Sequence, residues 1–153
     1  MYSKEQASQL KQAFWTAFGQ YMSPIRSADA EKISWVNYKT DIKHLYFRMY
    51  AGSNLAGIAI EIAHPDVGMQ ELFFEQFKEL KNVLTNCLEE EWEWQLHTTD
   101  EYGKTVTRIV KELAGVNVFD TNNWPRLISF LKPRIIALDE FWSSARYSFD
   151  PLR

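Results

Sequence analysis

The chain of 153 residues has few cysteines, glycines or prolines. Cys87 is the single cysteine, so an internal disulfide and a cluster of thiolate metal ligands are both excluded. This composition is typical of a reducing compartment. Six glycines and five prolines leave no low-complexity linker. The length suits one domain with its own core, and we expect a single domain over residues 1–153.

Long apolar runs and excess positive charge are also missing. No apolar run approaches the roughly 20 residues of a membrane span, and MYSKEQASQLKQ is polar where a signal peptide has its apolar segment. We therefore expect a cytoplasmic protein that does not contact a membrane. The formal net charge of -3 and pI near 5.6 exclude a basic field over the whole molecule. Any nucleic-acid binding therefore has to be local.

Aromatic residues, in contrast, are abundant. Six Trp, seven Tyr and ten Phe make up 15% of the chain, which is far from the composition of a disordered segment. Such a surplus predicts either a dense core or an adhesive surface. The second alternative favours a non-enzymatic interaction domain, and a homodimer is one arrangement that such a surface produces.

Apolar residues at three- and four-residue spacing predict three helices, over residues 3–23, 66–87 and 122–145. Ser3 and Gln6 have the spacing of a capping box at the start of the first helix. Asp66 follows His64-Pro65 and is expected to cap the second. Pro133 lies inside the third and predicts a kink or a split after Lys132, because proline cannot donate to the carbonyl of the preceding turn.

Alternating and apolar runs predict five strands, over residues 33–38, 42–50, 55–63, 91–98 and 104–113. Residues 51–54 and 100–103 are small or polar and are typical of hairpin loops. The expected order is α-β-β-β-α-β-β-α. The fold class is therefore α+β, a mostly antiparallel sheet of about five strands with helices packed on it.

The carboxylate Glu61 interrupts the apolar run LAGIAIEIAH. With residues 51–54 as the loop, Tyr50 pairs with Leu55 and His44 lies opposite Glu61. One face of the hairpin is then continuously apolar and suited to helix packing. The other face is polar and aromatic, and it holds Glu61.

The fourth strand extends both faces, with Trp92 and Trp94 on the apolar side and His97 on the polar side. This predicts a candidate functional face made of His44, Tyr46, Arg48, Tyr50, Glu61 and His97. The alternative is that these residues form only the solvated side of a one-sided antiparallel sheet.

Three chemistries are open for this face. Tyr46 and Tyr50 can stack on bases while Arg48 binds phosphate, which gives single-stranded nucleic-acid binding. A catalytic role requires His44 and Glu61 to share a sheltered pocket. A metal site lacks support, since the three histidines have no recognised ligand spacing, and we expect neither metal nor cofactor. Phosphate loops, GxSxG elbows and HExxH helices are absent from the sequence.

The predicted element order also resembles that of the restriction-endonuclease-like nuclease core. Asp41 and Glu61 stand where that core has its metal-binding acids, but the position of its catalytic lysine is Ala63. The resemblance therefore implies at most a degenerate nuclease.

Three blocks, NYKTDIKHLYFRM, AIEIAHPDVGMQELFFEQF and WPRLISFLKPRIIALDEFW, resemble a bacterial domain-of-unknown-function family, DUF4268, of a stand-alone type associated with Bacteroidetes. The resemblance spans nearly the whole chain. In other members a similar domain follows a restriction-endonuclease-like nuclease domain, which implies an accessory role near DNA-processing systems. The family supplies no catalytic residues that can be placed on this sequence.

Overall fold

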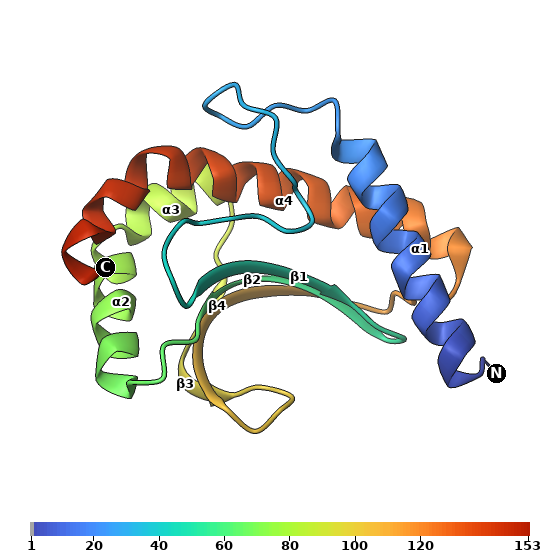
Figure 1. Ribbon diagram of the computed structural model, residues 1–153, viewed down its shortest axis with the longest axis horizontal. Helices are drawn as coiled ribbons and strands as arrows, with labels where there is room; N and C mark the ends of the chain where they lie inside the picture. The colour runs from blue at the N-terminus through green and yellow to red at the C-terminus, as the bar shows by residue number, and fades with distance from the viewer. Residues whose placement is uncertain (1) are drawn as a thin grey trace.

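The computed structural model describes residues 2–153, which form an α+β fold around a curved antiparallel sheet (Figure 1). The helices are α1 (Lys4–Met22), α2 (Val67–Glu79), α3 (Lys81–Leu88) and α4 (Trp124–Ala145), with 3-10 turns η1 (Thr121–Asn123) and η2 (Arg146–Leu152). The strands are β1 (Leu45–Ala51), β2 (Leu55–Ile62), β3 (Glu93–Thr99) and β4 (Thr105–Ala114). The predicted α+β class with an antiparallel sheet is therefore confirmed.

Within the described residues the sheet has four strands, in the order β1-β2-β4-β3, instead of the five expected. Residues 33–38 form a loop with a bend and a turn at residues 35–37. Their aromatic side chains point inward: Trp35 Nε1 donates to the carbonyl of Ile25 at 2.9 Å, and the Tyr38 hydroxyl donates to Asp139 at 2.6 Å. The alternation of apolar and polar residues over 33–38 therefore belongs to a loop that packs on α4 through Tyr38, and not to a strand. Without this strand, the chain does not have the element order on which the resemblance to the restriction-endonuclease-like nuclease core was based.

The second predicted helix is broken into α2 and α3 at Leu80, whose ψ of 11° is not helical. Neither proline nor glycine marks the break in the sequence. Its cause is tertiary, since α2 packs on β3, β4 and η2 whereas α3 packs on α4. The observed order is therefore α-β-β-α-α-β-β-α.

The helix ends follow the sequence closely. Ser3 and Gln6 form the predicted capping box, and Asp66 caps α2 by accepting from the N–H of Gly68. Of the kink or split predicted after Lys132, the split is wrong, because α4 continues through Pro133 to Ala145. One hydrogen bond lost to proline is offset by burial of the helix face on the core.

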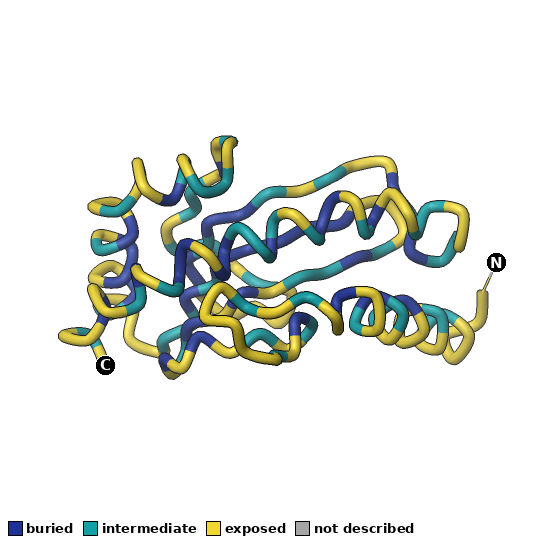
Figure 2. Tube along the Cα trace, turned by 90° about the horizontal axis from the view of Figure 1, so that it is seen from above, coloured by how far each residue is buried: buried dark blue, intermediate teal, exposed yellow. Residues whose placement is uncertain are grey.

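The core lies between α4 and the convex side of the sheet. Figure 1 shows α4 crossing that side, and Figure 2 shows buried positions on the strands and on the inner side of α4. Its large, almost fully buried members are Phe18, Ile58, Ile60, Phe77, Leu138, Phe141 and Trp142.

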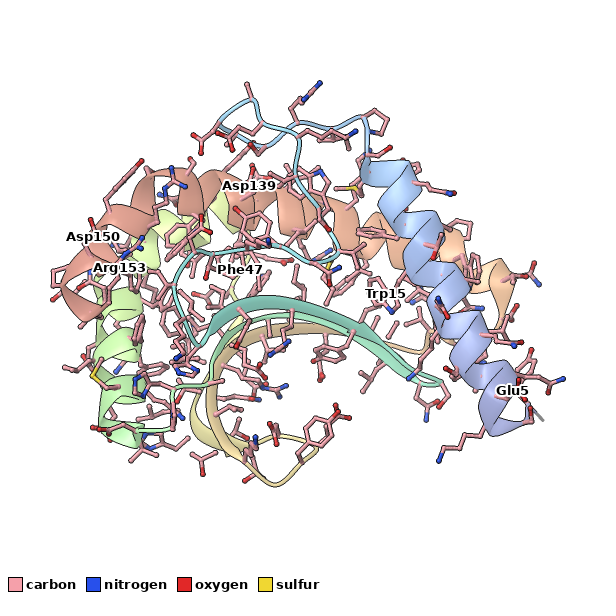
Figure 3. All side chains as sticks on the ribbon, viewed as in Figure 1. Glu5, Trp15, Phe47, Asp139, Asp150 and Arg153 are labelled. Carbon is pink, nitrogen blue, oxygen red and sulfur yellow. The ribbon has the colours of Figure 1, made fainter. Side chains whose placement is uncertain are left out.

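The long segment 23–44 is fastened to α4 by Asp139, which is 5% exposed. Its carboxylate accepts from the backbone N–H of Ala28 at 2.7 Å and from the Tyr38 hydroxyl at 2.6 Å. Trp142 Nε1 donates to the carbonyl of Thr40 at 3.0 Å. Figure 3 places Asp139 on the side of α4 that faces this segment. Burial and the bond to Asp139 raise the pKa of Tyr38 well above its usual value.

Candidate binding face on the concave side of the sheet

The register of β1 and β2 differs from the predicted one by two residues. Tyr46 lies opposite Glu61, and Tyr50 lies opposite Gly57. His44 precedes β1 in a left-handed conformation with φ of 69°, so its predicted pairing with Glu61 is wrong. Because side chains alternate with period two, a shift of two residues leaves each residue on its predicted face. Tyr46, Arg48, Tyr50 and Glu61 therefore share the concave side.

Glu61 points onto this concave side, where it is held by Arg48. The Nε of Arg48 donates to the Glu61 carboxylate, and its guanidinium lies 4.0 Å from the centre of the Tyr46 ring. The Glu61 side chain is 13% exposed, whereas that of Arg48 is 53% exposed. The carboxylate in the apolar run thus fixes an arginine that stays available at the surface.

Tyr50 lies flat across β2 and reaches β4. Its hydroxyl donates to Glu112 at 2.5 Å, across Gly57, which pairs with both residues. A Cβ at Gly57 would overlap the Tyr50 ring, so glycine is needed here for close approach. Burial, together with the bond to Glu112, raises the pKa of Tyr50, and its hydroxyl stays protonated at neutral pH.

The face continues onto β4 and β3 through Arg108. Its guanidinium donates to Gln95 Oε1 at 3.1 and 3.3 Å, and Gln95 in turn donates to Glu93 at 2.9 Å. The concave face therefore carries two arginines interleaved with carboxylates. These residues are Tyr46, Arg48, Tyr50, Glu61, Gln95, Glu93, Arg108 and Glu112.

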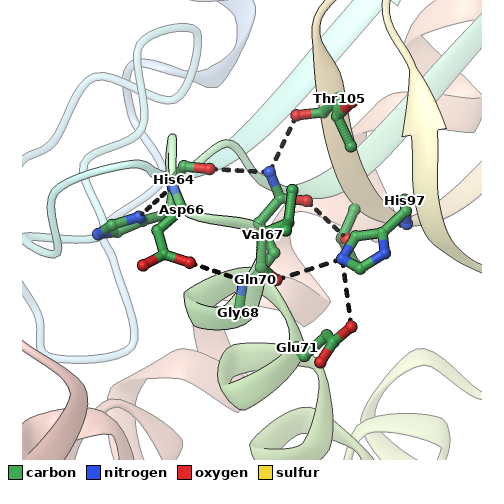
Figure 4. Close-up of polar contacts among 9 residues, drawn as sticks. His64, Asp66, Val67, Gly68, Gln70, Glu71, His97 and Thr105 are labelled. Carbon is green, nitrogen blue, oxygen red and sulfur yellow. Dashed lines mark hydrogen bonds and ion pairs between the residues drawn. The ribbon is translucent and has the colours of Figure 1, made fainter.

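His97 does not join this face. The β3–β4 register shifts between Gln95 and Thr98, and His97 has φ of 54° within the bulge. Its Nε2 lies 3.2 Å from the carbonyl of Val67 and 3.8 Å from Glu71, at the start of α2 (Figure 4). The extra residue of the bulge turns His97 to the helix side, which strict alternation does not anticipate.

His97 borders a buried hydrogen-bond network around Gln70. The Gln70 amide donates to the carbonyls of His64 and Thr105 and accepts from the Thr107 hydroxyl, at 2.8 to 2.9 Å (Figure 4). Gln70 is 1% exposed. With each partner in place, this network ties α2 to the sheet edge.

A cavity of about 820 Å³ opens on the concave side between the ends of β1 and β2 and the β3–β4 hairpin, which curls beneath the sheet (Figure 1). Its lining includes His44, Tyr46, Arg48 and Glu61. The His44 ring lies 5.1 Å from that of His64, and desolvation with the neighbouring positive groups lowers the pKa of His44. Four of the predicted residues thus border one hollow, Tyr50 lies further along the face, and His97 is outside it.

Arg108 and Glu112 are the residues that the sequence prediction missed. They fall on the same side of KTVTRIVKEL as Val106 and Val110, with Thr107, Ile109 and Lys111 on the other side, so alternation alone did not mark this side as polar. The side of β4 that lies on the same face of the sheet as Glu61 is set by the pairing of β2 with β4, in which Glu61 lies opposite Arg108 and Gly57 opposite Glu112. Strands far apart in the sequence carry no local signal of their register.

The arrangement is chemically suited to binding. Over residues 2–153 no group of three or more His, Cys, Asp or Glu side chains is placed to hold a metal ion. The carboxylates of Glu61 and Glu112 are both occupied by hydrogen bonds from the same face. Asp41, the other acid of the nuclease comparison, lies outside the cavity that Glu61 borders and has φ of 65° in the loop before β1.

Comparison with known proteins identifies one family. The model of the domain of unknown function DUF4268 matches residues 10–146, and the chain therefore belongs to that family. No curated protein and no solved structure matches the chain. No helix of the described residues is long and apolar enough to cross a membrane.

Proposed function

We propose that this member of the DUF4268 family is a non-catalytic binding module that holds part of a partner protein on the concave face of its sheet. The observation that carries the proposal is a sheet face left open by the helices of the described chain, on which tyrosine and arginine side chains are fixed in place. An open sheet face with ordered Tyr and Arg has the composition of a protein interface.

Preorganisation supports this function. Arg48 is held between Glu61 and the Tyr46 ring, and Tyr50 is held between Gly57 and Glu112. A partner that meets these side chains loses little rotamer entropy on binding, because the rotamers are set in the free protein.

The charge pattern favours a protein partner over nucleic acid. Arg48 and Arg108 are interleaved with Glu61, Glu93 and Glu112, so a phosphate backbone would meet carboxylates at each step. The ring of Tyr46 is already faced by a guanidinium, and that of Tyr50 lies against the sheet. Both rings are thus less open to bases than stacking requires.

The test begins with a peptide library displayed on phage and selected against the purified protein. Enriched peptides are synthesised and titrated while backbone amide shifts are followed by NMR. Arg108→Ala removes one arginine of the face, and Arg26→Ala is its control, since Arg26 is exposed in the loop after α1. We expect shifts along β1, β2 and β4 and affinity reduced about tenfold by Arg108→Ala alone.

Two results would overturn the proposal. Peptides that bind equally to the wild type and to Arg108→Ala would move the interface elsewhere, and the concave face would be a solvated surface. Binding of a single-stranded oligonucleotide at low salt, weakened by Arg108→Ala, would replace the protein partner with nucleic acid.

A further inference from the structure

Strand β1 forms one edge of the sheet. The N–H of Ala63 donates to the His44 carbonyl, and the N–H of Gly52 donates to the Leu55 carbonyl. In an antiparallel ladder every second residue bonds to the neighbouring strand, so these two bonds show that the even-numbered residues of β1 bond to β2. The backbone N–H and C=O groups of the odd-numbered residues therefore point away from β2, toward the outer edge of the sheet. In the first odd-numbered residue, Leu45, the N–H donates to the Ile42 carbonyl and the carbonyl accepts from the Thr40 hydroxyl.

The next two odd residues, Phe47 and Met49, have no such partner. No hydrogen bond to their outward N–H and C=O groups is formed by another segment of residues 2–153. Edge strands in native proteins are usually shielded by proline, by lysine or by a covering segment. The sequence LYFRMYA of β1 has neither proline nor lysine.

A groove of about 500 Å³ runs along this edge. Its apolar walls come from α1, from the loop before β1 and from β1 itself, and its charged lining residues, Lys39 and Arg48, are both cationic. The lining residues are Trp15, Val36, Asn37, Tyr38, Lys39, Tyr46, Phe47, Arg48 and Met49. Lys39 is exposed and forms no ion pair within the described part of the chain.

We propose that this groove binds an extended acidic segment of a partner protein as an added strand beside β1. The outward groups of Phe47 and Met49 supply backbone hydrogen bonds, and alternate side chains of the segment enter the apolar groove. Because Arg48 points to the concave face while Phe47 and Met49 point to the helices, the segment has apolar and acidic residues in alternation.

A second copy of the chain fits the groove less well. Antiparallel pairing of two β1 strands about Phe47 brings two copies of Arg48 and of Lys39 close together. Because Glu61 already pairs with Arg48, the repulsion that opposes this pairing comes mainly from the two Lys39 ammonium groups, and an acidic segment neutralises Lys39. The groove shares Tyr46 and Arg48 with the concave face, but Arg108 does not line it, so Arg108→Ala distinguishes the two proposals.

The test uses synthetic nine-residue peptides and the intact protein, with NMR shifts read on β1. The probe alternates glutamate with valine, and a matched peptide has lysine in place of glutamate. We expect only the acidic peptide to bind at low salt and to shift the amides of Phe47 and Met49. An acidic peptide with N-methyl groups on the amides facing β1 is expected to lose its binding, because its donors are gone.

Three protein variants complete the design. Met49→Pro removes an outward N–H while sparing the ladder to β2, and Met49→Leu keeps that N–H as the control. We expect at least a fivefold loss of affinity for Met49→Pro and none for Met49→Leu. Lys39→Glu leaves the backbone intact and is expected to weaken binding about fivefold at low salt.

Equal binding of the lysine peptide, or tight binding of the N-methylated peptide, would overturn the proposal. So would a concentration-dependent dimer in sedimentation that Lys39→Glu strengthens, because the groove would then belong to a second copy. Arg108→Ala is expected to leave peptide binding in the groove unchanged. This separates a failure here from a failure of the concave-face function.

Discussion

Substituting alanine for Gly57 is expected to destabilise the protein through one specific contact. The added Cβ would overlap the ring of Tyr50, which lies flat on this glycine. The backbone at Gly57 is not in the left-handed region, so alanine is compatible with its conformation. The ring has to leave, and its hydrogen bond to Glu112 is then lost.

The size of the effect follows from two opposing contributions. A hydrogen bond to a charged group contributes about 1.5–3 kcal/mol, and the lower end applies because Tyr50 is only half buried. Replacing glycine by alanine inside a strand stabilises by roughly 0.5–1 kcal/mol, since the unfolded chain loses freedom. The net expectation is a loss of about 1 kcal/mol in the free energy of unfolding.

The assay is urea unfolding of the wild type, Gly57→Ala, Tyr50→Ala and the double variant. Once Tyr50 is truncated, the three atoms that lie nearest to the new Cβ are gone, and Gly57→Ala is expected to stabilise by roughly 0.5–1 kcal/mol. The sign of the substitution therefore reverses between the two backgrounds. Equal destabilisation in both would show that the Tyr50 ring is not the cause.

Three further substitutions probe the groups that hold the loops and helices on the sheet. Asp139→Ala leaves two donors of the 23–44 segment unpaired and is expected to cost about 2–4 kcal/mol in thermal unfolding, whereas Tyr38→Phe removes only one of the bonds and costs about 1 kcal/mol. Gln70→Ala orphans three buried or partly buried partners and is expected to cost about 2–4 kcal/mol, with faster hydrogen exchange in α2. Burial raises the pKa of Glu90, but its hydrogen bonds, chiefly from Arg134, outweigh burial and hold that pKa below the ordinary 4.5. The Glu90–Arg134 pair therefore contributes its full stability above about pH 4.5 and loses it as the pH falls through the lower folded pKa, so Glu90→Gln is expected to flatten the decline in stability below about pH 4.5.

Each of these has a result that would contradict it. Equal losses for Asp139→Ala and Tyr38→Phe would mean that the backbone bond from Ala28 contributes nothing. If hydrogen exchange in α2 of the Gln70→Ala variant is unchanged, the network around Gln70 does not hold α2 on the sheet. If the stability of the Glu90→Gln variant falls with decreasing pH in the same way as that of the wild type, other carboxylates cause the loss of stability in acid.

Sequence patterns were most informative where structure is local. The capping box at Ser3 and the cap at Asp66 depend on contacts within a few residues, and both are present. Which side chains of β1 and β2 share a face was also predictable, because alternation survives an error of two residues in register. Tyr46, Arg48, Tyr50 and Glu61 were therefore grouped correctly on one face.

The remaining site residues were beyond local patterns for identifiable reasons. His97 was misplaced because a bulge adds one residue to β3 and reverses the side to which its side chain points. His44 was misplaced because β1 begins at Leu45, three residues later than predicted, and His44 precedes it in a left-handed conformation. Arg108 and Glu112 reach the site only through the pairing of β4 with β2, strands that lie more than 40 residues apart.

The sequence alone determined the α+β class, the helix caps and the two faces of the first hairpin, because each depends on the geometry of neighbouring residues. Tertiary structure decided the break at Leu80, the loop over residues 33–38 and the pairing of β2 with β4. In each case the competing local preference is small, and burial against α4 or against another strand contributes more. The concave face and the position of β1 at the edge of the sheet are products of that packing.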